Sequence, residues 1–285
     1  MKLTIVTVTK NCRDLLSRTY HTLEAQDSQA FDWVIVDALS TDGTRELIQK
    51  IASKSNVRVI DRAPYGIYDA MNIGANDVDT GWILFLNAGD LLLSSKSLSR
   101  MKNVFLEFAN ADCIALPVAH LTPNGFLYDM TFPGLDVNHY RIHHQGAFIA
   151  ADAFHRAGGY DIKLKWAADG KLLDDICSKG NVVFSTLMEI GFEIGGASAI
   201  NYQEVLAEIA TYRRPTNSGS RTRLLQTKNR IKLVMVTLSK NKLALLITKY
   251  FAQRQRKVLA LISESHAPGF NDEDSIFRKS LSLKF

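Results

Sequence analysis

Cysteine and proline are both scarce in this 285-residue sequence. The three cysteines, Cys12, Cys113 and Cys177, are odd in number, lie far apart and form no C-x-x-C pair. This pattern argues against a disulfide framework and against a zinc site, and it favours a reducing compartment. The six prolines and 17 glycines form no low-complexity segment, and no internal repeat is present.

Long apolar runs are also missing. No uncharged run approaches the roughly 20 residues that a membrane-spanning helix needs. The apolar start of the chain, Met1 to Val6, is too short for the hydrophobic region of a signal peptide and has no small-residue cleavage site after it. We therefore expect a cytoplasmic protein.

Acidic residues are absent from one long stretch. Between Arg213 and Lys257 the chain carries 13 lysines and arginines and no aspartate or glutamate, whereas the remainder has 21 basic and 29 acidic residues. The overall net charge of +5 therefore combines a basic segment with an acidic body. Such an asymmetry favours an anionic partner surface, for which membrane headgroups and nucleic acid both qualify.

Strands and helices alternate through the first part of the chain. Hydrophobic residues make up 46% and charged residues 22%, a balance that allows a sizeable core. Short apolar runs alternate with segments of helical spacing, which predicts βαβ units and a mostly parallel sheet. The predicted strands cover residues 3–9, 32–37, 57–60, 82–86 and 112–116, and the predicted helices cover 13–25, 45–54, 66–75 and 98–108.

The later part of the chain has a different rhythm. Its elements are shorter and do not alternate regularly, which predicts an α+β arrangement. The predicted strands cover residues 125–130, 145–150 and 182–184, and the predicted helices cover 152–156, 170–179 and 202–212.

Two acids occupy positions where a parallel sheet presents ligands. Asp37 ends one predicted strand, and Asp90 follows another. Ligands of open α/β sheets bind beyond the carboxyl ends of the strands. Asp37 would accept hydrogen bonds from a base or ribose. Asp90 would suit Mg²⁺ or Mn²⁺ held together with substrate phosphates, although a cap of the following helix also explains it.

Other polar positions, taken alone, are better explained by structural roles. Asp69 and Asn72 lie three residues apart and share a helix face, which is either solvated or directed at a ligand. Gly66, which precedes them, permits close approach of the backbone to a ligand. Thr41 or Asp42 is best explained as the N-cap of the 45–54 helix.

Four motifs follow one another in the first third of the chain. They are Thr7-Val8-Thr9-Lys10-Asn11, VDALSTDGT over 36–44, GIYDAMNIGA over 66–75 and FLNAGD over 85–90. In this order and spacing they resemble family 2 glycosyltransferases with the GT-A fold, and the last two together resemble bacterial members that build surface polysaccharides. The resemblance covers about residues 1–210. It implies an α/β fold with a Rossmann-like, mostly parallel sheet flanked by helices.

The resemblance further implies a nucleotide-sugar donor and a divalent cation, Mn²⁺ or Mg²⁺. Asp90 would be the metal-binding acid. Gly89 stands where such enzymes commonly carry an acid, so Asp90 is the one firm metal ligand of the motif, with Asn87 as a neutral helper. The nucleotide and donor side would be formed by Thr7, Thr9, Asp37, Gly66, Asp69, Asn72 and Asn87.

A catalytic base is also implied. GGYD over 158–161 and WAAD over 166–169 resemble the G-G-F-D…E-D segment of the family, which makes Asp169 the base. The position of Asp169 before a predicted helix equally suits an N-cap.

Two more segments resemble family motifs. His143, His144 and Gln145 resemble the segment that lines the acceptor cleft. The glycines and hydroxyl of GGAS, Gly195, Gly196 and Ser198, would meet the diphosphate through backbone N–H groups, unless this segment is simply a flexible turn.

These inferences divide the chain into three parts. Residues 1–214 are expected to form the glycosyltransferase domain, with a nucleotide-sugar-binding half over 1–116 and an acceptor-binding half over 117–214. A Pro/Gly/Ser linker spans 215–220. Residues 221–285 are expected to form basic amphipathic helices and a tail.

The predicted activity is inverting transfer of a sugar from a nucleotide-diphosphate sugar to a hydroxyl of a lipid-linked saccharide. Basic amphipathic helices over 221–262 would hold the protein at the inner face of the cytoplasmic membrane, because such helices lie in the interface and bind anionic lipid. Packing on the core or a dimer contact would explain the same helices.

Two other functions, a nucleotidyltransferase and a nucleic-acid binder, compete with this prediction, and a third is disfavoured. A nucleotidyltransferase of sugar activation would show a Gly-rich basic loop near the N-terminus, but Thr7 to Cys12 has no glycine. A non-enzymatic nucleic-acid binder would explain the basic segment but not the acids, so no nucleic-acid partner is expected. A dinucleotide oxidoreductase is disfavoured because no G-x-G-x-x-G follows the first strand.

Overall fold

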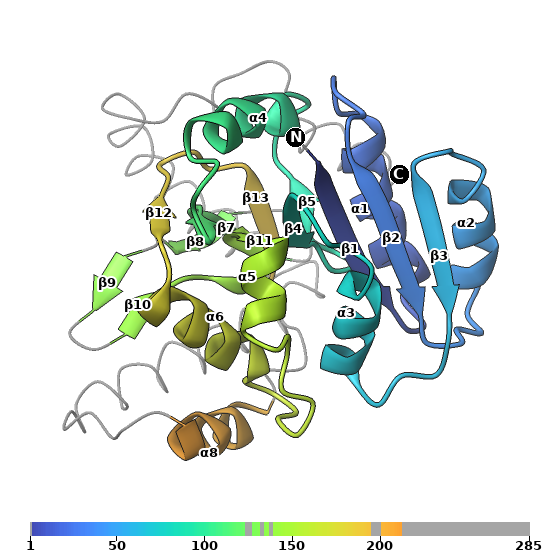
Figure 1. Ribbon diagram of the computed structural model, residues 1–285. Coiled ribbons are helices and arrows are strands. Elements are labelled where there is room, and N and C mark those ends of the chain that lie inside the picture. Colours follow the sequence, from blue (N-terminus) through green and yellow to red (C-terminus); the bar gives the residue numbers. More distant parts are fainter. Residues whose placement is uncertain (1, 123–126, 132–133, 137–138, 195–200, 213–285) are drawn as a thin grey trace.

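The computed structural model describes residues 2–122, 127–131, 134–136, 139–194 and 201–212 (Figure 1). The GGAS segment, the linker and the basic segment from residue 213 onward lie outside these residues, so the predictions made for them are not addressed by the structure.

A seven-stranded sheet forms the centre of the protein, in the order β12-β6-β11-β4-β1-β2-β3 (Figure 1). Strands β1 to β4 are mutually parallel, and β11 runs antiparallel between β4 and β6. This mostly parallel α/β sheet is the predicted fold class. The strands are β1 (Leu3–Thr9), β2 (Asp32–Asp37), β3 (Val57–Asp61), β4 (Trp82–Phe85), β6 (Cys113–Ala115), β11 (Ala147–Ala150) and β12 (Val182–Phe184).

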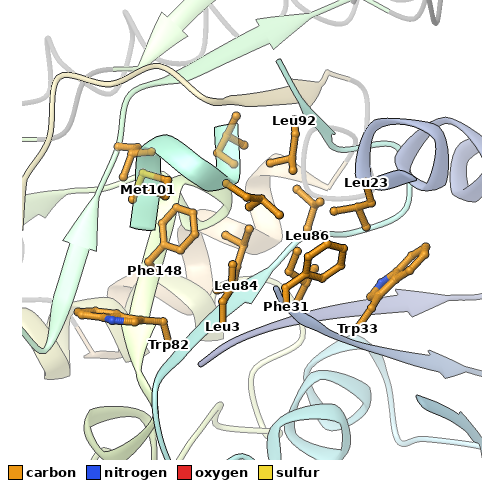
Figure 2. Close-up of a cluster of buried hydrophobic side chains, with 14 of the residues drawn as sticks. Leu3, Leu23, Phe31, Trp33, Trp82, Leu84, Leu86, Leu92, Met101 and Phe148 are labelled. Carbon is orange, nitrogen blue, oxygen red and sulfur yellow. The ribbon is translucent and has the colours of Figure 1, made fainter. Parts of the chain in front are cut away.

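Helices cover both faces of this sheet. Successive residues of a strand point to opposite faces, so both faces carry apolar side chains that the helices bury. Ile5 packs with the helices of one face and Val6 with those of the other. Figure 2 shows the first cluster, in which Met101 lies beside Phe148 and Leu23 lies beside Leu86. The first face carries α1 (Arg13–Glu24), α2 (Thr44–Ile51) and α4 (Ser97–Glu107), and the second carries α3 (Ile67–Ala75), α5 (Ala151–Arg156) and α6 (Ala168–Lys179).

A smaller sheet was not predicted from the sequence. It has the order β5-β13-β7-β8, and a separate hairpin pairs β9 with β10. Most of these strands have three to five residues, and β5 has only two, so none shows a clear period. Their bounds are Leu91–Leu92 (β5), Val118–Leu121 (β7), Leu127–Thr131 (β8), Gly134–Asp136 (β9), His139–Arg141 (β10) and Ile190–Glu193 (β13).

Several predicted boundaries differ from those of the structure by one to three residues, and two of these differences concern the site. The strand predicted over 145–150 begins only at Ala147, because His144–Gly146 forms a short 3-10 helix, η1. The 45–54 helix begins at Thr44, with Gly43 as its N-cap, so neither Thr41 nor Asp42 is the cap. The Asp42 carboxylate nevertheless accepts hydrogen bonds from the backbone N–H groups of Thr44 and Arg13, which lie in the first turns of α2 and α1.

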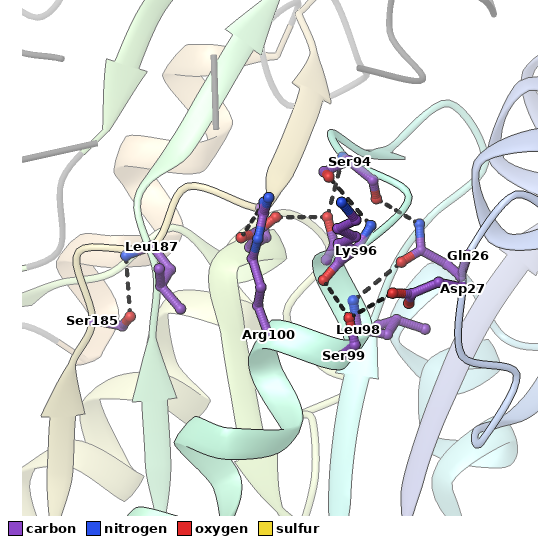
Figure 3. Close-up of polar contacts among 11 residues, drawn as sticks. Gln26, Asp27, Ser94, Lys96, Leu98, Ser99, Arg100, Ser185 and Leu187 are labelled. Carbon is purple, nitrogen blue, oxygen red and sulfur yellow. Dashed lines mark hydrogen bonds and ion pairs between the residues drawn. The ribbon is translucent and has the colours of Figure 1, made fainter. Parts of the chain in front are cut away.

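A mostly buried polar network joins the smaller sheet to α1 and α4 (Figure 3). The Gln26 side chain donates to the carbonyl of Ser94 and accepts from the N–H of Leu98, at the start of α4. The carboxylate of Glu189, just before β13, accepts from Ser97 and Arg100. Because these groups are buried and mutually paired, they fix β13 relative to α1 and α4. None of the described helices is long and apolar enough to cross a membrane.

Candidate active site

The carboxyl ends of β1, β2 and β4 meet at one edge of the main sheet. The chain leaves β1 toward β2 and β3 and later returns to the other side of β1 as β4. The crevice beside β1 is therefore a topological switch point, where open α/β sheets bind ligands. Asp37 and the Asn87–Asp90 turn both lie at this edge.

Asp37 is held in a dense polar network. Its carboxylate accepts hydrogen bonds from the Thr9 hydroxyl at 2.8 Å, the Ser40 hydroxyl at 2.6 Å and the Ser40 N–H at 2.8 Å. Asn11 ties the two loops together by donating its N–H to Ser40. Asp37 is only 1% exposed, so in this structure its carboxylate organises the loops after β1 and β2. Its contact with a base or ribose remains a prediction.

Thr7 points into the core. Its hydroxyl accepts a hydrogen bond from the Trp33 indole at 2.9 Å and donates to the carbonyl of Leu86 at 2.7 Å, and the residue has no exposed surface. Contact of this hydroxyl with a nucleotide would require both bonds to be replaced.

The Asn87–Asp90 turn explains why Gly89 replaces an acid. The N–H of Asp90 bonds to the carbonyl of Asn87, and Gly89 has φ of +102°, as the third position of a type II turn requires. The Thr19 hydroxyl accepts from the N–H of Gly89 and donates to the carbonyl of Asp90, which fixes the turn on α1. A Cβ at position 89 would also lie 3.3 Å from Cδ2 of Leu15.

Asp90 is a buried carboxyl, 3% exposed. Burial raises its pKa well above the ordinary value, although hydrogen bonds from the Asn87 N–H and the Gln145 side chain oppose this shift. The nearby charge of Glu193 raises the pKa further, and Glu193 is itself paired with Arg18 on α1. The ionised form of Asp90 therefore lacks a cationic partner among its named neighbours.

The residues of this turn fit a divalent cation that takes most of its ligands from elsewhere. Among the described residues, no group of three or more His, Cys, Asp or Glu side chains is arranged to hold a metal. Asp90 offers a carboxylate whose charge a cation would balance, and the buried Oδ1 of Asn87 has no hydrogen-bond partner within the described part of the chain. One carboxylate, one amide oxygen and substrate phosphates form the ligand set that Mg²⁺ and Mn²⁺ accept.

Asp69 and Asn72 both make structural contacts at α3. The Asp69 carboxylate accepts the N–H of Tyr65, at 2.7 Å. The Asn72 amide both donates to and accepts from the backbone of Tyr160, at 2.9 and 2.8 Å. Gly66 has φ of +92° and open space where a Cβ would stand, so the predicted approach of a ligand is sterically free there. The donor contacts of these residues remain predictions.

Asp169 lies in the first turn of α6, but it does not cap this helix. The N-cap is Ala167, which has no side-chain capping bond. The Asp169 carboxylate instead accepts a hydrogen bond from the Tyr68 hydroxyl on α3, at 2.9 Å. Asp169 is partly exposed, whereas Tyr68 is buried.

His144 and Tyr160 lie beside Asp169. Nε2 of His144 is 2.5 Å from the Tyr160 hydroxyl, and the Phe85 ring packs against both side chains. Burial lowers the pKa of His144, and the negative charge of Asp169 opposes this shift. Burial also raises the pKa of Tyr160, and Asp169 adds to that increase. The predominant forms at neutral pH are therefore a neutral imidazole and a protonated phenol.

Two consecutive residues of η1 lie between the buried acid Asp90 and the candidate base Asp169. Gln145 hydrogen-bonds to Asp90, while His144 lies within the electrostatic influence of Asp169. The centroid of the His143 ring lies 4.9 Å from those of His120 and Phe192. The structure thus brings together Asp90, Gln145, His144 and Asp169, whereas the ring contacts of His143 are with His120 and Phe192.

Several residues of the site were not predicted. Tyr68 and Tyr160 lie within motifs quoted from the sequence, GIYDAMN and GGYD, so their motif membership was the available signal. Arg18, Thr19 and Glu193 lie in segments with no such signal, and only the packing of α1 and β13 brings them to the turn after β4.

Taken together, the fold and the edge cluster define an α/β protein of GT-A type, with acids at the switch point of the sheet. The family model "Glycosyl transferase family 2" matches residues 4–159, and the chain belongs to this family. Asp169 lies beyond the matched segment.

Curated relatives agree with this assignment. A PGL/p-HBAD biosynthesis glycosyltransferase of Mycobacterium tuberculosis is 30% identical over 171 residues, which are 58% of this chain and 65% of the relative. The chain thus spans somewhat less than two thirds of that relative. A teichoic acid poly(glycerol phosphate) polymerase of Staphylococcus epidermidis is 28% identical over 124 residues, or 42% of this chain and 17% of the relative.

Solved structures share the fold. S. aureus TarS 1-349 in complex with UDP-GlcNAc has a TM-score of 0.59 at 16% identity, and the match covers 83% of this chain and 72% of the TarS 1-349 chain. The mannosyltransferase PcManGT of Pyrobaculum calidifontis, in complex with GDP-Man and Mn²⁺, has a TM-score of 0.58 at 13% identity and covers 99% of this chain and 83% of PcManGT. At these identities the likeness concerns the fold alone.

Proposed function

We propose that this protein is an inverting glycosyltransferase that moves a sugar from a nucleoside-diphosphate sugar to a hydroxyl of a saccharide acceptor. One observation carries the proposal, namely that His144-Gln145 lies between the buried acid at the switch point and the partly exposed Asp169. A diphosphate at Asp90 and an acceptor hydroxyl at Asp169 would then lie on opposite sides of one short segment.

The donor would extend along the carboxyl edge of the sheet. Its diphosphate would lie at the Asn87–Asp90 turn, and its nucleoside would cross β1 toward Asp37 on β2. Two strand spacings separate β4 from β2, about 10 Å, which suits the reach of a nucleoside. The complexes of TarS with UDP-GlcNAc and of PcManGT with GDP-Man support this class of donor.

In the reaction, the acceptor oxygen forms a bond to the anomeric carbon while the bond from that carbon to the diphosphate oxygen breaks. Asp169 takes the proton of the acceptor hydroxyl as general base, and Tyr68 holds its carboxylate in place. Attack from the face opposite the leaving group inverts the configuration. A divalent cation held by Asp90 and Asn87 would stabilise the negative charge of the departing nucleoside diphosphate.

The acceptor is proposed to be a lipid-linked saccharide used in surface-polysaccharide biosynthesis. The names of the relatives, PGL/p-HBAD biosynthesis glycosyltransferase and teichoic acid polymerase, support a cell-surface product. The basic composition of residues 213–257 supports a location at an anionic membrane surface, where such an acceptor is found.

The Asp169→Asn variant tests the proposal. Because Asn keeps the shape but accepts no proton, transfer should fall at least about 100-fold. Binding of the nucleoside diphosphate, measured by calorimetry with Mn²⁺, should stay within about twofold, because the donor lies at the other side of η1. The control is Asp175→Asn, which removes a partly exposed carboxylate from the same helix, one that pairs with Lys171. Undiminished transfer by Asp169→Asn, or loss of nucleotide binding, would contradict the assignment.

A further inference from the structure

A glutamate on α8 (Tyr202–Tyr212) binds the backbone just before α6. The Glu208 carboxylate accepts hydrogen bonds from three consecutive N–H groups, those of Lys165 at 2.8 Å, Trp166 at 2.7 Å and Ala167 at 3.0 Å. Hydrogen bonds to an ionised acceptor are the stronger kind, and one carboxylate here satisfies three donors. This contact therefore holds the segment in one defined conformation.

The bound segment leads directly into the turn that carries Asp169. Ala167 is the N-cap of α6, and no side chain of α6 itself caps this helix. The N–H groups at a helix start have no partner within the helix. Glu208 supplies such a partner to the N–H of Ala167, and it thereby helps to set the orientation of the first turn of α6. The Tyr212 hydroxyl, also on α8, donates to the carbonyl of Ala167 at 3.2 Å.

Asp169 is thereby held from two directions. Tyr68 on α3 donates to its carboxylate, and Glu208 on α8 fixes the backbone two residues before it. Burial raises the pKa of Tyr68, the charge of Asp169 raises it further, and the charge of Glu208 adds to both, so the glutamate lies within electrostatic range of the same group. Glu208 lies outside the segment that the family model matches.

We propose that Glu208 is a positioning residue, which sets the orientation of Asp169 by binding the backbone of residues 165–167. The inference rests on the proposed role of Asp169 as general base. A general base must lie within hydrogen-bond reach of the proton that it removes, and a shift of about 1 Å can reduce the rate of an enzyme about 100-fold.

Glu208→Gln and Glu208→Ala test the inference in the full-length protein. Gln keeps one acceptor oxygen and Ala keeps none, so transfer should fall in the order Glu, Gln, Ala, by about 10- to 100-fold for Ala. Calorimetry with UDP or GDP and Mn²⁺ should still give the wild-type stoichiometry and affinity, because the donor edge of the sheet is untouched. Glu204→Gln, an exposed acid on the same helix, should behave as wild type.

The stoichiometry distinguishes positioning from a general loss of structure. A variant that merely unfolds more easily would bind less nucleotide per chain, and this result would overturn the inference, as would unchanged transfer by Glu208→Ala.

A second comparison uses Asp169→Asn as background. If Glu208 acts through Asp169, adding Glu208→Ala should cause no further loss, whereas a multiplied loss would also overturn the inference. Failure of the proposed function would appear separately, as full activity of Asp169→Asn alone.

Discussion

Asp90 combines burial with a negative charge that its named neighbours do not balance. The carboxyl accepts hydrogen bonds from the Asn87 N–H and the Gln145 side chain, yet burial and Glu193 together raise its pKa. A folded-state pKa above the unfolded value means that the protonated carboxyl stabilises the fold at low pH. This contribution is lost as the pH rises through the folded-state pKa. A bound cation would offset the cost of the charged form.

Asp90→Asn should therefore stabilise the protein without metal and remove the stabilisation that bound metal and nucleotide provide. Without metal, the variant should gain stability relative to wild type as the pH rises from about 4, because the buried charge is gone. With UDP or GDP and Mn²⁺, the unfolding midpoint of wild type should rise and that of the variant should not. Thermal unfolding at several pH values measures both effects, with Asp175→Asn as the control. An equal Mn²⁺ response in the two proteins would rule out Asp90 as a metal ligand.

The turn between β4 and β5 shows how an element constrains the chemistry of a motif. Gly89 adopts a left-handed backbone, and its N–H bonds to Thr19 on α1. A side chain there would be strained by the backbone and would meet Leu15. The missing acid is thus a consequence of turn geometry in this chain, and the site relies on Asp90 and Asn87.

Restoring an acid by Gly89→Asp should destabilise the protein by about 1–2 kcal/mol, the usual cost of a left-handed conformation for a non-glycine residue. Urea unfolding measures the difference. Gly89→Ala adds only a Cβ to the same left-handed backbone and should lose a similar amount of stability. If Gly89→Ala were as stable as wild type, the backbone conformation of Gly89 would not explain its presence.

The GGYD turn shows a similar constraint on α3. A Cβ at Gly159 would stand 2.8 Å from Oδ1 of Asn72, and the same amide binds the backbone of Tyr160. Asn72 therefore holds the second half of the domain against α3, which places Tyr160 beside His144. The helix face that was predicted from the spacing of Asp69 and Asn72 does exist, but the contacts that Asn72 makes here are with protein backbone.

The main sheet joins the two predicted halves of the domain. β11, from the later half, lies between β4 and β6 of the earlier half, so the boundary predicted at 116/117 passes through one hydrogen-bonded sheet. Asp90 and Asp169, one from each half, are consequently held by the same framework. The basic segment continues from α8, which binds the backbone before Asp169.

Deleting residues 221–285 should abolish binding to anionic vesicles, because this removes most of the 13 lysines and arginines counted between residues 213 and 257. Co-sedimentation with vesicles containing phosphatidylglycerol measures the effect, and vesicles of phosphatidylcholine alone serve as the control. The truncated protein should still bind nucleoside diphosphate, since both sheets lie before residue 213. Equal sedimentation of the two proteins would contradict the membrane role.

The sequence by itself determined the parallel core and the positions of its acids. Apolar runs bounded by turn residues located β1 to β4 and the intervening helices, because burial on both faces of a parallel sheet leaves a clear local pattern. Asp37, Asp90 and Asp169 were recognised from motifs around strand ends and helix starts. These features depend on residues close together in the chain.

Only the tertiary structure decided which groups act on those acids. Tyr68 meets Asp169 across 101 positions because α3 and α6 pack on the same face of the sheet. Gln145 reaches Asp90, and Glu208 binds the backbone before Asp169, through contacts that no local pattern records. Hydrogen-bond partners distant in sequence are set by how elements pack, so the positions of these acids in the elements could be predicted and their partners could not.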